Sequence, residues 1–415
     1  MKVLWFSNCV LGNTVSNGSG SWLFAMSKLI CNSVDLVNVT LSPIKDVKFN
    51  NYSNFTEVLL PHFKLTKMGI PEAKDIHIIQ ETIAKINPEI IHIWGLEGFW
   101  TQLYAKGYIK GNVIVEIQGL LQPCYEVFWG GISPREFVLR SICLRNLLYR
   151  NSFLPNRRRV FKEKGNQANA MLKNCKVVST QSDWVRGQIK FNLSPYCKIY
   201  NTLRPIRSEF WEAEKWQKHV GTCRIFTSMS YYLPFKGIHV LIKAVSILKK
   251  KYDNVILEIA GVEKKDLIWY RQFSYLKYLQ KLSKQLGVAD NVIYVGSLTA
   301  KQIVEHLQCS DVFVNPSFVE SFSASTAEAL ALGVPTVTAY AGAMPDFSKN
   351  RNVALYYSPM DYSDCASKIL TLLENHEVRE ALIKNANIEM ESLCSSDKVL
   401  ERQLSIYECM MSNNV

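Results

Sequence analysis

Short runs rich in Val and Ile alternate with segments of helical periodicity along almost the whole chain of 415 residues. Nine runs are expected to form strands, at residues 2–6, 89–93, 113–117, 176–180, 224–229, 255–260, 291–295, 311–315 and 334–338. Between these runs, apolar residues recur at helical spacing, as they do over 238–245. Near-continuous apolar strands separated by helices are typical of parallel sheets covered on both faces, so we predict an α/β fold.

The alternation pauses near residue 205 and starts again at Arg224, and the segment 203–222 carries no strand pattern. The chain is also too long for one small core, since domains average about 150 residues. We therefore predict two doubly wound, Rossmann-like domains, residues 1–207 and 223–395, joined by a linker over 208–222. Ligands of such sheets bind beyond the C-terminal strand ends, so the two domains are expected to face a central cleft.

The composition excludes several classes of protein. An apolar fraction of 48% is incompatible with wholesale disorder, and no run approaches the ~18 apolar residues of a membrane-spanning helix. The first apolar stretch is too short for a signal peptide and is interpreted as a strand. The eleven Cys show no CxxC and no zinc-like spacing, which predicts free thiols in a reducing cytoplasm and no structural metal.

The net charge of +12 is concentrated in one segment, because residues 135–190 contain thirteen Lys or Arg against three Asp or Glu. Residues 135–150, with Arg140 and Arg145 among apolar neighbours, are predicted to form one helix, and Arg157, Arg158 and Arg159 follow. A basic amphipathic stretch suits an anionic membrane surface. The alternative is a core-facing helix with a solvated basic side. A nucleic-acid surface is disfavoured, because the aromatic residues form no RNA-binding signature.

The segment NPSFVESFSASTAEALALGVPTV, residues 315–337, is the strongest candidate for a binding site. A strand leads into a loop of small residues, a helix is expected from about Ser325, and Gly333 suits its C-terminal cap. A helix N-terminus favours phosphate, and Glu320 and Glu328 beside it can accept hydrogen bonds from sugar hydroxyls. The alternative for Ser325 and Glu328 is a simple capping box, which leaves Glu320 unexplained.

Two further loops follow predicted strands. Lys236 and Gly237 open a predicted helix, where a lysine opposes the helix dipole unless an anion is bound there. Gly12, Gly18 and Gly20 lie between the first strand and a helix expected over 21–30, and they permit close approach to a bound group or simply form a turn. The sequence NGSGS is not a GxGxxG fingerprint, so a dehydrogenase is disfavoured.

The segment 315–345, with the Lys-Gly helix start, resembles the donor-binding half of retaining family 4 glycosyltransferases, which have the GT-B fold. The family pattern P-S-x-x-E-G-F-G-x-x-x-x-E-A-x-A-x-G-x-P-V matches this chain at both glutamates, Pro316, Ser317, Phe322, Gly333 and Pro335. AGAMPD at 341–346 resembles the family's G-G-x-P-E. The segment 87–95 resembles the strand that enters the ligand face of the family's N-terminal domain. The segments 115–122, 181–186 and 200–204 resemble a bacterial branch of the family that is often found in surface-polysaccharide pathways.

The resemblance implies a cytoplasmic enzyme that transfers sugar from a UDP- or GDP-linked donor to a glycan or lipid-linked acceptor, without a metal or other cofactor. Its basic segment would then place it at the inner face of the cell membrane. Glu320 and Lys236 would be catalytic. The other implied roles are donor binding by Glu328, Ser323, Ala324, Ser325, Gly18, Gly20 and Tyr231, and acceptor binding by Gln118, Trp94 and Glu97. The helix at about 396–411, within the C-terminal segment 396–415, would pack back on the first domain.

The chain departs from the family pattern at several positions. Tyr231 stands where many relatives carry an arginine that binds phosphate, and Arg204 or Arg207 could supply that charge. Ser321 and Ser323 replace the two glycines of E-G-F-G, which narrows the backbone freedom there. Gln118 replaces a histidine, and an amide is a poor general base.

Two other functions remain open from the sequence. One is a nucleotide-sugar epimerase of the same fold, which would alter the sugar without an acceptor. The other is a membrane- or nucleic-acid-binding scaffold with a decayed active site, which the changes at Tyr231 and Gln118 would permit.

Overall fold

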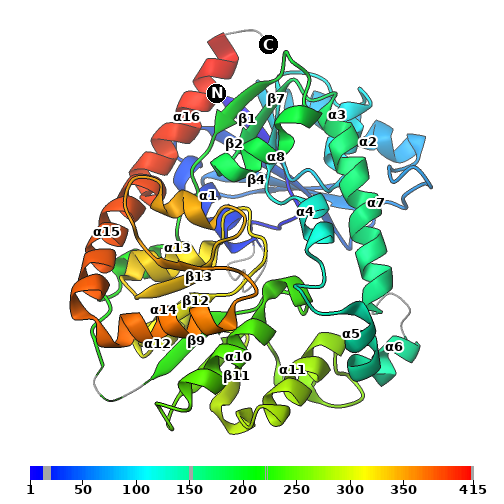
Figure 1. Ribbon diagram of the computed structural model, residues 1–415. Coiled ribbons are helices and arrows are strands. Elements are labelled where there is room, and N and C mark those ends of the chain that lie inside the picture. The colour runs from blue at the N-terminus through cyan, green and yellow to red at the C-terminus, as the bar shows by residue number, and fades with distance from the viewer. Residues whose placement is uncertain (13–19, 149–152, 220, 222, 413–415) are drawn as a thin grey trace.

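The computed structural model describes residues 1–12, 20–148, 153–219, 221 and 223–412, which form two α/β units (Figure 1). The first unit has one eight-stranded sheet and the second a six-stranded sheet. The restart of the strand pattern at Arg224 marks the first strand of the second sheet, as predicted.

The first sheet has the strand order β3-β4-β2-β1-β5-β6-β7-β8. Its strands are β1 Lys2–Phe6, β2 Asp35–Ser42, β3 Lys48–Asn51, β4 Phe55–Pro61, β5 Ile90–Trp94, β6 Val113–Ile117, β7 Val177–Thr180 and β8 Lys198–Asn201. All neighbours are parallel except β3 and β4. The chain order reverses between β1 and β5, so ligands are expected above this point of the sheet.

The second sheet has the order β11-β10-β9-β12-β13-β14, and all its neighbours are parallel. Its strands are β9 Arg224–Ser228, β10 Ile256–Ala260, β11 Val292–Gly296, β12 Val312–Asn315, β13 Thr336–Ala339 and β14 Leu355–Tyr357. The chain order reverses between β9 and β12. This reversal is the second place where a ligand site is expected.

Helices cover both faces of each sheet (Figure 1). In β1, Val3 and Trp5 face one apolar core while Leu4 and Phe6 face another, as the two-residue period of a strand requires. The helices of the first unit are α1 Ser21–Ile30, α2 Ala73–Ile86, α3 Phe99–Ala105, α4 Leu121–Glu126, α5 Pro134–Ser141, α6 Leu144–Leu148, α7 Leu154–Leu172 and α8 Asp183–Ile189. Those that follow are α9 Ser208–Glu212, α10 Ile238–Leu248, α11 Ser274–Gln285, α12 Ala300–Gln308, α13 Ala324–Leu332, α14 Tyr362–Glu374, α15 His376–Cys394 and α16 Ser396–Ser412.

The last helix, α16, lies against the first unit, where it contacts α1 and β5 (Figure 1). Tyr407 anchors it: its hydroxyl accepts a hydrogen bond from Trp5 Nε1 at 3.0 Å and lies 2.8 Å from His92 Nδ1. The chain therefore returns to its starting unit after completing the second one.

The predicted helix over 135–150 is wrong, because the helix breaks after Ser141. Ile142 leaves the helical conformation with φ −55° and ψ 125°, and its carbonyl accepts a hydrogen bond from Lys277 Nζ of α11 at 2.5 Å. Residues 121–148, here called the arm, leave the first sheet and pack on the second unit. Phe137 of the arm is 1% exposed within the apolar core of that unit, where its ring centroid lies 5.4 Å from that of Tyr278.

Candidate active site

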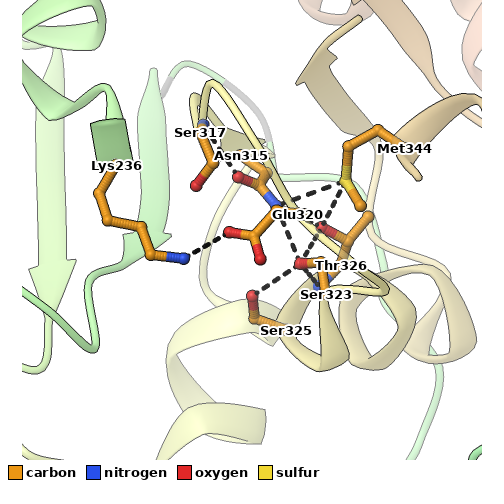
Figure 2. A network of polar contacts seen from close by, with 8 residues as sticks. All are labelled: Lys236, Asn315, Ser317, Glu320, Ser323, Ser325, Thr326 and Met344. Atoms are coloured by element: carbon orange, nitrogen blue, oxygen red, sulfur yellow. Dashed lines mark hydrogen bonds and ion pairs between the residues drawn. The ribbon is translucent and has the colours of Figure 1, made fainter. Parts of the chain in front are cut away.

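Lys236 and Glu320 face each other beyond the C-terminal ends of β9 and β12 (Figure 2). Lys236 ends the 3-10 turn Pro234–Lys236, and its Nζ lies 2.6 Å from Oε1 of Glu320. The two side chains are 13% and 17% exposed, so the ion pair is partly screened from water but open on one side. The pair therefore sits where the order of the second sheet reverses.

Two glycines allow the loops around this ion pair to approach one another closely. Gly237 has φ +72°, and a Cβ there would lie 1.8 Å from the carbonyl oxygen of Pro316. Gly342 has φ +57°, and its Cβ would lie 2.3 Å from the carbonyl oxygen of Glu320. Glycine is required at both positions, because any side chain would push the loops after β9 and β13 away from Glu320.

Helix α13 begins one residue earlier than predicted, and Ser323 caps it. Ser323 has φ +67°, which is rare for a residue with a side chain, and its Oγ accepts a hydrogen bond from Thr326 N at 3.3 Å. Asn315 Nδ2 donates hydrogen bonds to the side-chain hydroxyls of Ser323 and Thr326, each at 2.8 Å (Figure 2). Hydrogen bonds thus maintain the left-handed conformation at Ser323, and the exposed Ala324 opens the helix toward solvent.

Glu328 lies on the second turn of α13, and it does not form a capping box with Ser325, because Ser323 is the N-cap. Its Oε1 lies 2.7 Å from Nε of Arg207, which comes from the segment between the two sheets. Burial raises the pKa of Glu328, and the nearby Arg207 charge opposes that increase. A pocket beside this pair is lined by Trp22 and Arg204 from the first unit and by Phe322 and Ala324 from the second.

Part of the chain matches a known protein family. Residues 210–388 match the sequence profile of the family described as glycosyl transferases group 1. An uncharacterized glycosyltransferase of Methanocaldococcus jannaschii is 27% identical over 251 residues, which are 57% of this chain and 57% of that protein. A GDP-mannose-dependent α-(1-6)-phosphatidylinositol monomannoside mannosyltransferase of Mycolicibacterium smegmatis is 28% identical over 134 residues, 31% of this chain and 32% of that protein.

The matched regions span less than two thirds of the length of these curated relatives. Solved structures are similar over almost the whole chain. Sucrose-phosphate synthase from Thermosynechococcus elongatus has a TM-score of 0.73 at 14% identity, covering 99% of this chain and 100% of that one. Anabaena HepE in complex with UDP and glucose has a TM-score of 0.66 at 14% identity, covering 98% and 99%. The predicted GT-B fold is confirmed.

The residues predicted on the acceptor side lie at or after the C-terminal ends of strands of the first sheet. Glu97 follows β5 and is exposed, whereas Trp94 at the end of β5 is 4% exposed and stacks on His92 with centroids 3.9 Å apart. Trp94 therefore belongs to the apolar core of the first unit and offers little surface to a ligand. Gln118 follows β6 and is half-buried.

Charged groups of both units act on the residues beside the Lys236–Glu320 pair. Cys124 of α4 lies within Coulombic range of Lys236, Glu320 and Glu97, and burial is the main reason that its pKa rises to about 12. Burial therefore disfavours the thiolate of Cys124, which is the form that acts as a nucleophile. Glu97 also lies in the field of Lys164 and Arg204.

The predicted glycine loop is described only in part. Gly20 has φ +101° before α1, and a Cβ there would lie 2.3 Å from Cys9 Sγ, so a tight turn accounts for this glycine. Gly18 lies outside the described residues. The backbone N–H of Leu11, just before this loop, donates to the buried Glu57 at 2.6 Å. Glu57 thus fixes the point where the glycine loop begins.

Segments 115–122, 181–186 and 200–204, which resemble a bacterial branch, meet at Glu116. This carboxylate is 1% exposed and accepts hydrogen bonds from Gln181 Nε2 and Thr202 Oγ1, both at 3.0 Å. Burial raises its pKa. Next to this network, Ser182 Oγ donates to the carbonyl of Ser321 at 2.9 Å, across the cleft. These motifs therefore fix the first unit against the loop that carries Glu320.

Tyr231 and the basic residues lie beside the cleft or along the arm. Tyr231 is 52% exposed in the loop after β9, within Coulombic range of Arg157, whose pKa is lowered mainly by burial. The guanidinium of Arg145 covers the ring of Phe273 at 4.1 Å. These contacts are internal, so neither arginine lies on a purely solvated basic face.

The remaining arginines of the predicted basic patch also differ in their surroundings. The guanidinium of Arg158 covers the ring of Tyr125 at 4.1 Å, whereas Arg159 is exposed and pairs with Glu163 at 2.7 Å. The side chain of Arg140 is outside the described part of the chain. No described helix is long and apolar enough to cross a bilayer.

Three site residues were not singled out from the sequence. Asn315 organises the cap of α13, Gly342 admits the backbone of Glu320, and Glu57 fixes the start of the glycine loop. A polar residue that ends an apolar strand was the available signal for Asn315. Within the described ranges, no three His, Cys, Asp or Glu side chains gather as potential metal ligands.

Proposed function

We propose that this protein is a retaining glycosyltransferase that moves a hexose from a nucleoside diphosphate sugar to a hydroxyl acceptor. The observation that carries the proposal is the Lys236–Glu320 pair, 2.6 Å apart beside the open start of α13. The helix start and the lysine together provide positive charge for a leaving diphosphate, and the carboxylate adjoins the space for the sugar.

Each residue has a role in this reaction. As the bond from the anomeric carbon to the diphosphate oxygen breaks, Lys236 and the N–H groups at Ala324 and Ser325 stabilise the developing negative charge. Glu320 orients the donor sugar near the reacting carbon. Glu328, held by Arg207, accepts hydrogen bonds from the ribose. The departing phosphate takes the acceptor proton, so Gln118 needs only to orient the acceptor hydroxyl.

We further propose that residues 223–395 bind the donor and residues 1–207 bind the acceptor, without a metal ion. The lysine and the helix dipole would provide the positive charge that a metal supplies in other transferases. The named relatives support nucleotide-sugar chemistry: one is GDP-mannose-dependent, and one neighbour was solved with UDP and glucose. A role in polysaccharide or glycolipid synthesis, with a lipid-linked acceptor at the inner membrane face, belongs to the same proposal.

A donor screen tests this function. Purified protein is mixed with UDP- and GDP-sugars, and thermal unfolding is followed. At least one donor should raise the Tm, because a ligand that binds only the folded state stabilises it. If no nucleotide or nucleotide sugar moves the Tm, the proposal is wrong.

Variants connect the activity to the site. Glu320→Gln and Lys236→Ala should each abolish most transfer, whereas Lys301→Ala and Glu305→Gln, at exposed positions of α12, should not. Product analysis then separates the alternatives. An epimerase would change the sugar with no acceptor present, and a scaffold would bind vesicles or nucleic acid without affinity for any donor.

A further inference from the structure

Arg204 is a buried cation without a counter-ion in the described structure. It follows β8, and 9% of its surface is exposed. Its Nε and Nη2 are buried and reach no hydrogen-bond acceptor among the described residues. No described carboxylate lies within ion-pair distance of it, whereas its neighbour Arg207 is paired with Glu328. Burying a charge without a partner is costly, so a group of this kind requires an explanation.

The surroundings hold the Arg204 side chain in one direction. Its guanidinium carbon lies 4.0 Å above the ring of Trp22 and 5.7 Å from that of Phe322, which precedes the cap of α13. The face of an aromatic ring attracts a cation, but it accepts hydrogen bonds much more weakly than an anion does. Two residues earlier, Thr202 is tied to the buried Glu116, which fixes the backbone that carries Arg204.

The charge of Arg204 is retained at neutral pH. Burial lowers its pKa to about 10, and the more distant carboxylates Glu116 and Glu97 oppose that decrease. Neither of these carboxylates pairs with it directly in the described structure. Arg204 therefore brings a positive charge to the lining of the pocket, and its Nε and Nη2 have no hydrogen-bond acceptor among the described residues.

That pocket also contains the start of α13. Ala324, its first residue, lines the pocket together with Arg204 and is exposed. The first N–H groups of a helix have no acceptor within the helix, and the dipole favours an anion there. Two independent features, the helix start and the unpaired guanidinium, thus point into one space.

We propose that Arg204 binds the diphosphate of the donor from the first unit, across the cleft from Lys236. This inference rests on the proposed function and adds a ligand contact to it. It also accounts for Tyr231: the loop after β9 lacks the expected second cation, and the first unit provides one. The donor then contacts both units.

The test compares Arg204→Met with the wild-type protein. Methionine keeps an apolar side chain against Trp22 but removes the charge and the donors. Dissociation constants are measured calorimetrically for UDP, GDP and inorganic pyrophosphate. The variant should bind the preferred nucleoside diphosphate and pyrophosphate about 10 to 100 times more weakly, as expected for lost charged hydrogen bonds. Arg204→Lys should recover part of that affinity.

Arg186→Met, at an exposed position of α8, is the matched control and should change nothing. Without ligand, Arg204→Met should melt at the wild-type temperature or above it, because an unpaired buried charge has been removed. A purely structural arginine would instead lower the Tm and leave the affinities unchanged.

The outcomes separate the two proposals. If the wild-type protein binds a nucleoside diphosphate and Arg204→Met binds it within twofold, the role of Arg204 is wrong and the proposed function stands. If the wild-type protein binds neither UDP nor GDP, the proposed function fails. Pyrophosphate then tests whether Arg204 belongs to an anion site. If the wild-type protein and Arg204→Met bind pyrophosphate equally, or if neither binds it, the role of Arg204 is wrong.

Discussion

Nζ of Lys236 lies 2.6 Å from Oε1 of Glu320, so two loops that follow neighbouring parallel strands are joined by an ion pair at the cleft. The backbone reinforces this junction, because Phe318 N donates to the carbonyl of Phe235 at 2.8 Å and Ala343 N donates to that of Glu320 at 2.8 Å. The lysine and the carboxylate are thus held in place before any ligand arrives. This preorganisation is the condition under which electrostatic stabilisation of a transition state is most effective.

The two partners of this pair should respond differently to substitution. Lys236→Met should lower kcat/KM by about 10² to 10³ and also weaken binding of the nucleoside diphosphate product by about tenfold or more, since the lysine faces the phosphates. Glu320→Gln should lower kcat/KM as much but leave product affinity within about threefold. Steady-state kinetics and calorimetry check both expectations, and equal product affinity in the two variants would contradict this division of roles.

Gly237→Ala should destabilise the protein by more than about 3 kcal/mol, because the new Cβ would collide with the Pro316 carbonyl in addition to the cost of positive φ. Gly287→Ala is the matched control, with φ +68° but nothing within 4 Å of the added carbon. It should cost only the conformational part, about 1–2 kcal/mol. Urea unfolding of both variants measures the difference, and similar losses would show that the close approach is unimportant.

Ser323 should tolerate glycine better than alanine. Glycine removes the cost of the left-handed backbone and is itself an acceptable cap, so Ser323→Gly should change the unfolding free energy by less than about 1 kcal/mol. Ser323→Ala keeps the strained φ and loses the hydrogen bond to Thr326, which should cost about 1–2 kcal/mol. Thermal unfolding ranks the two, and a reversed order would mean that the hydroxyl does not hold the cap.

Stability should fall in mild acid because of two buried histidines. Burial lowers the pKa of His92 and of His239 from 6.5 to about 3. The unfolded chain takes up protons below pH 6.5 while the folded protein does not. The contribution of the two histidines to the free energy of unfolding is therefore fully present above pH 6.5. It decreases as the pH falls toward 3, by up to about 1.4 kcal/mol per pH unit for each histidine.

Buried carboxyls with raised pKa values oppose this trend, so a variant must isolate it. His239 Nε2 donates to the carbonyl of Gly130 at 2.9 Å, and Nδ1 lies 2.9 Å from the hydroxyl of Tyr275. His239→Gln cannot take up a proton. Between pH 6 and 4.5 its unfolding free energy should fall less steeply than that of the wild-type protein, and parallel slopes would contradict the assignment.

The strands that could be predicted are those whose residues are apolar on both faces. The runs at β1 and β6 were placed to the residue, whereas β2 was not predicted. Asn38 lies in the middle of β2, fully buried and hydrogen-bonded to Ser7 and Glu57, so its polarity concealed a central strand. The short β14 has only three residues and offers no pattern to detect.

The candidate site could be predicted in part for a geometric reason. Loops that follow parallel strands lie at the same edge of a sheet, and both Lys236 and Glu320 follow predicted strands, so the sequence is consistent with their common position. The pairing of Arg207 with Glu328 could not be predicted, because the two residues are 121 positions apart. The cap of α13 was misplaced because propensity rules do not predict a serine in the left-handed backbone conformation. The hydrogen bonds of the Ser323 side chain with Asn315 and Thr326 stabilise that conformation.

The arm changes how the two units can move. The chain enters the second unit through the arm, returns to the first through α7 Leu154–Leu172, and passes between the units again from β8 to β9 and near Ser395, so several connections join the two units. One of them, α7, has 19 residues and is about 28 Å long, with Leu154 in the core of the second unit and Leu172 in that of the first. A rigid rod anchored at both ends resists torsion. Widening of the cleft must therefore tilt this rod, and the free swivel that a single tether would permit is lost.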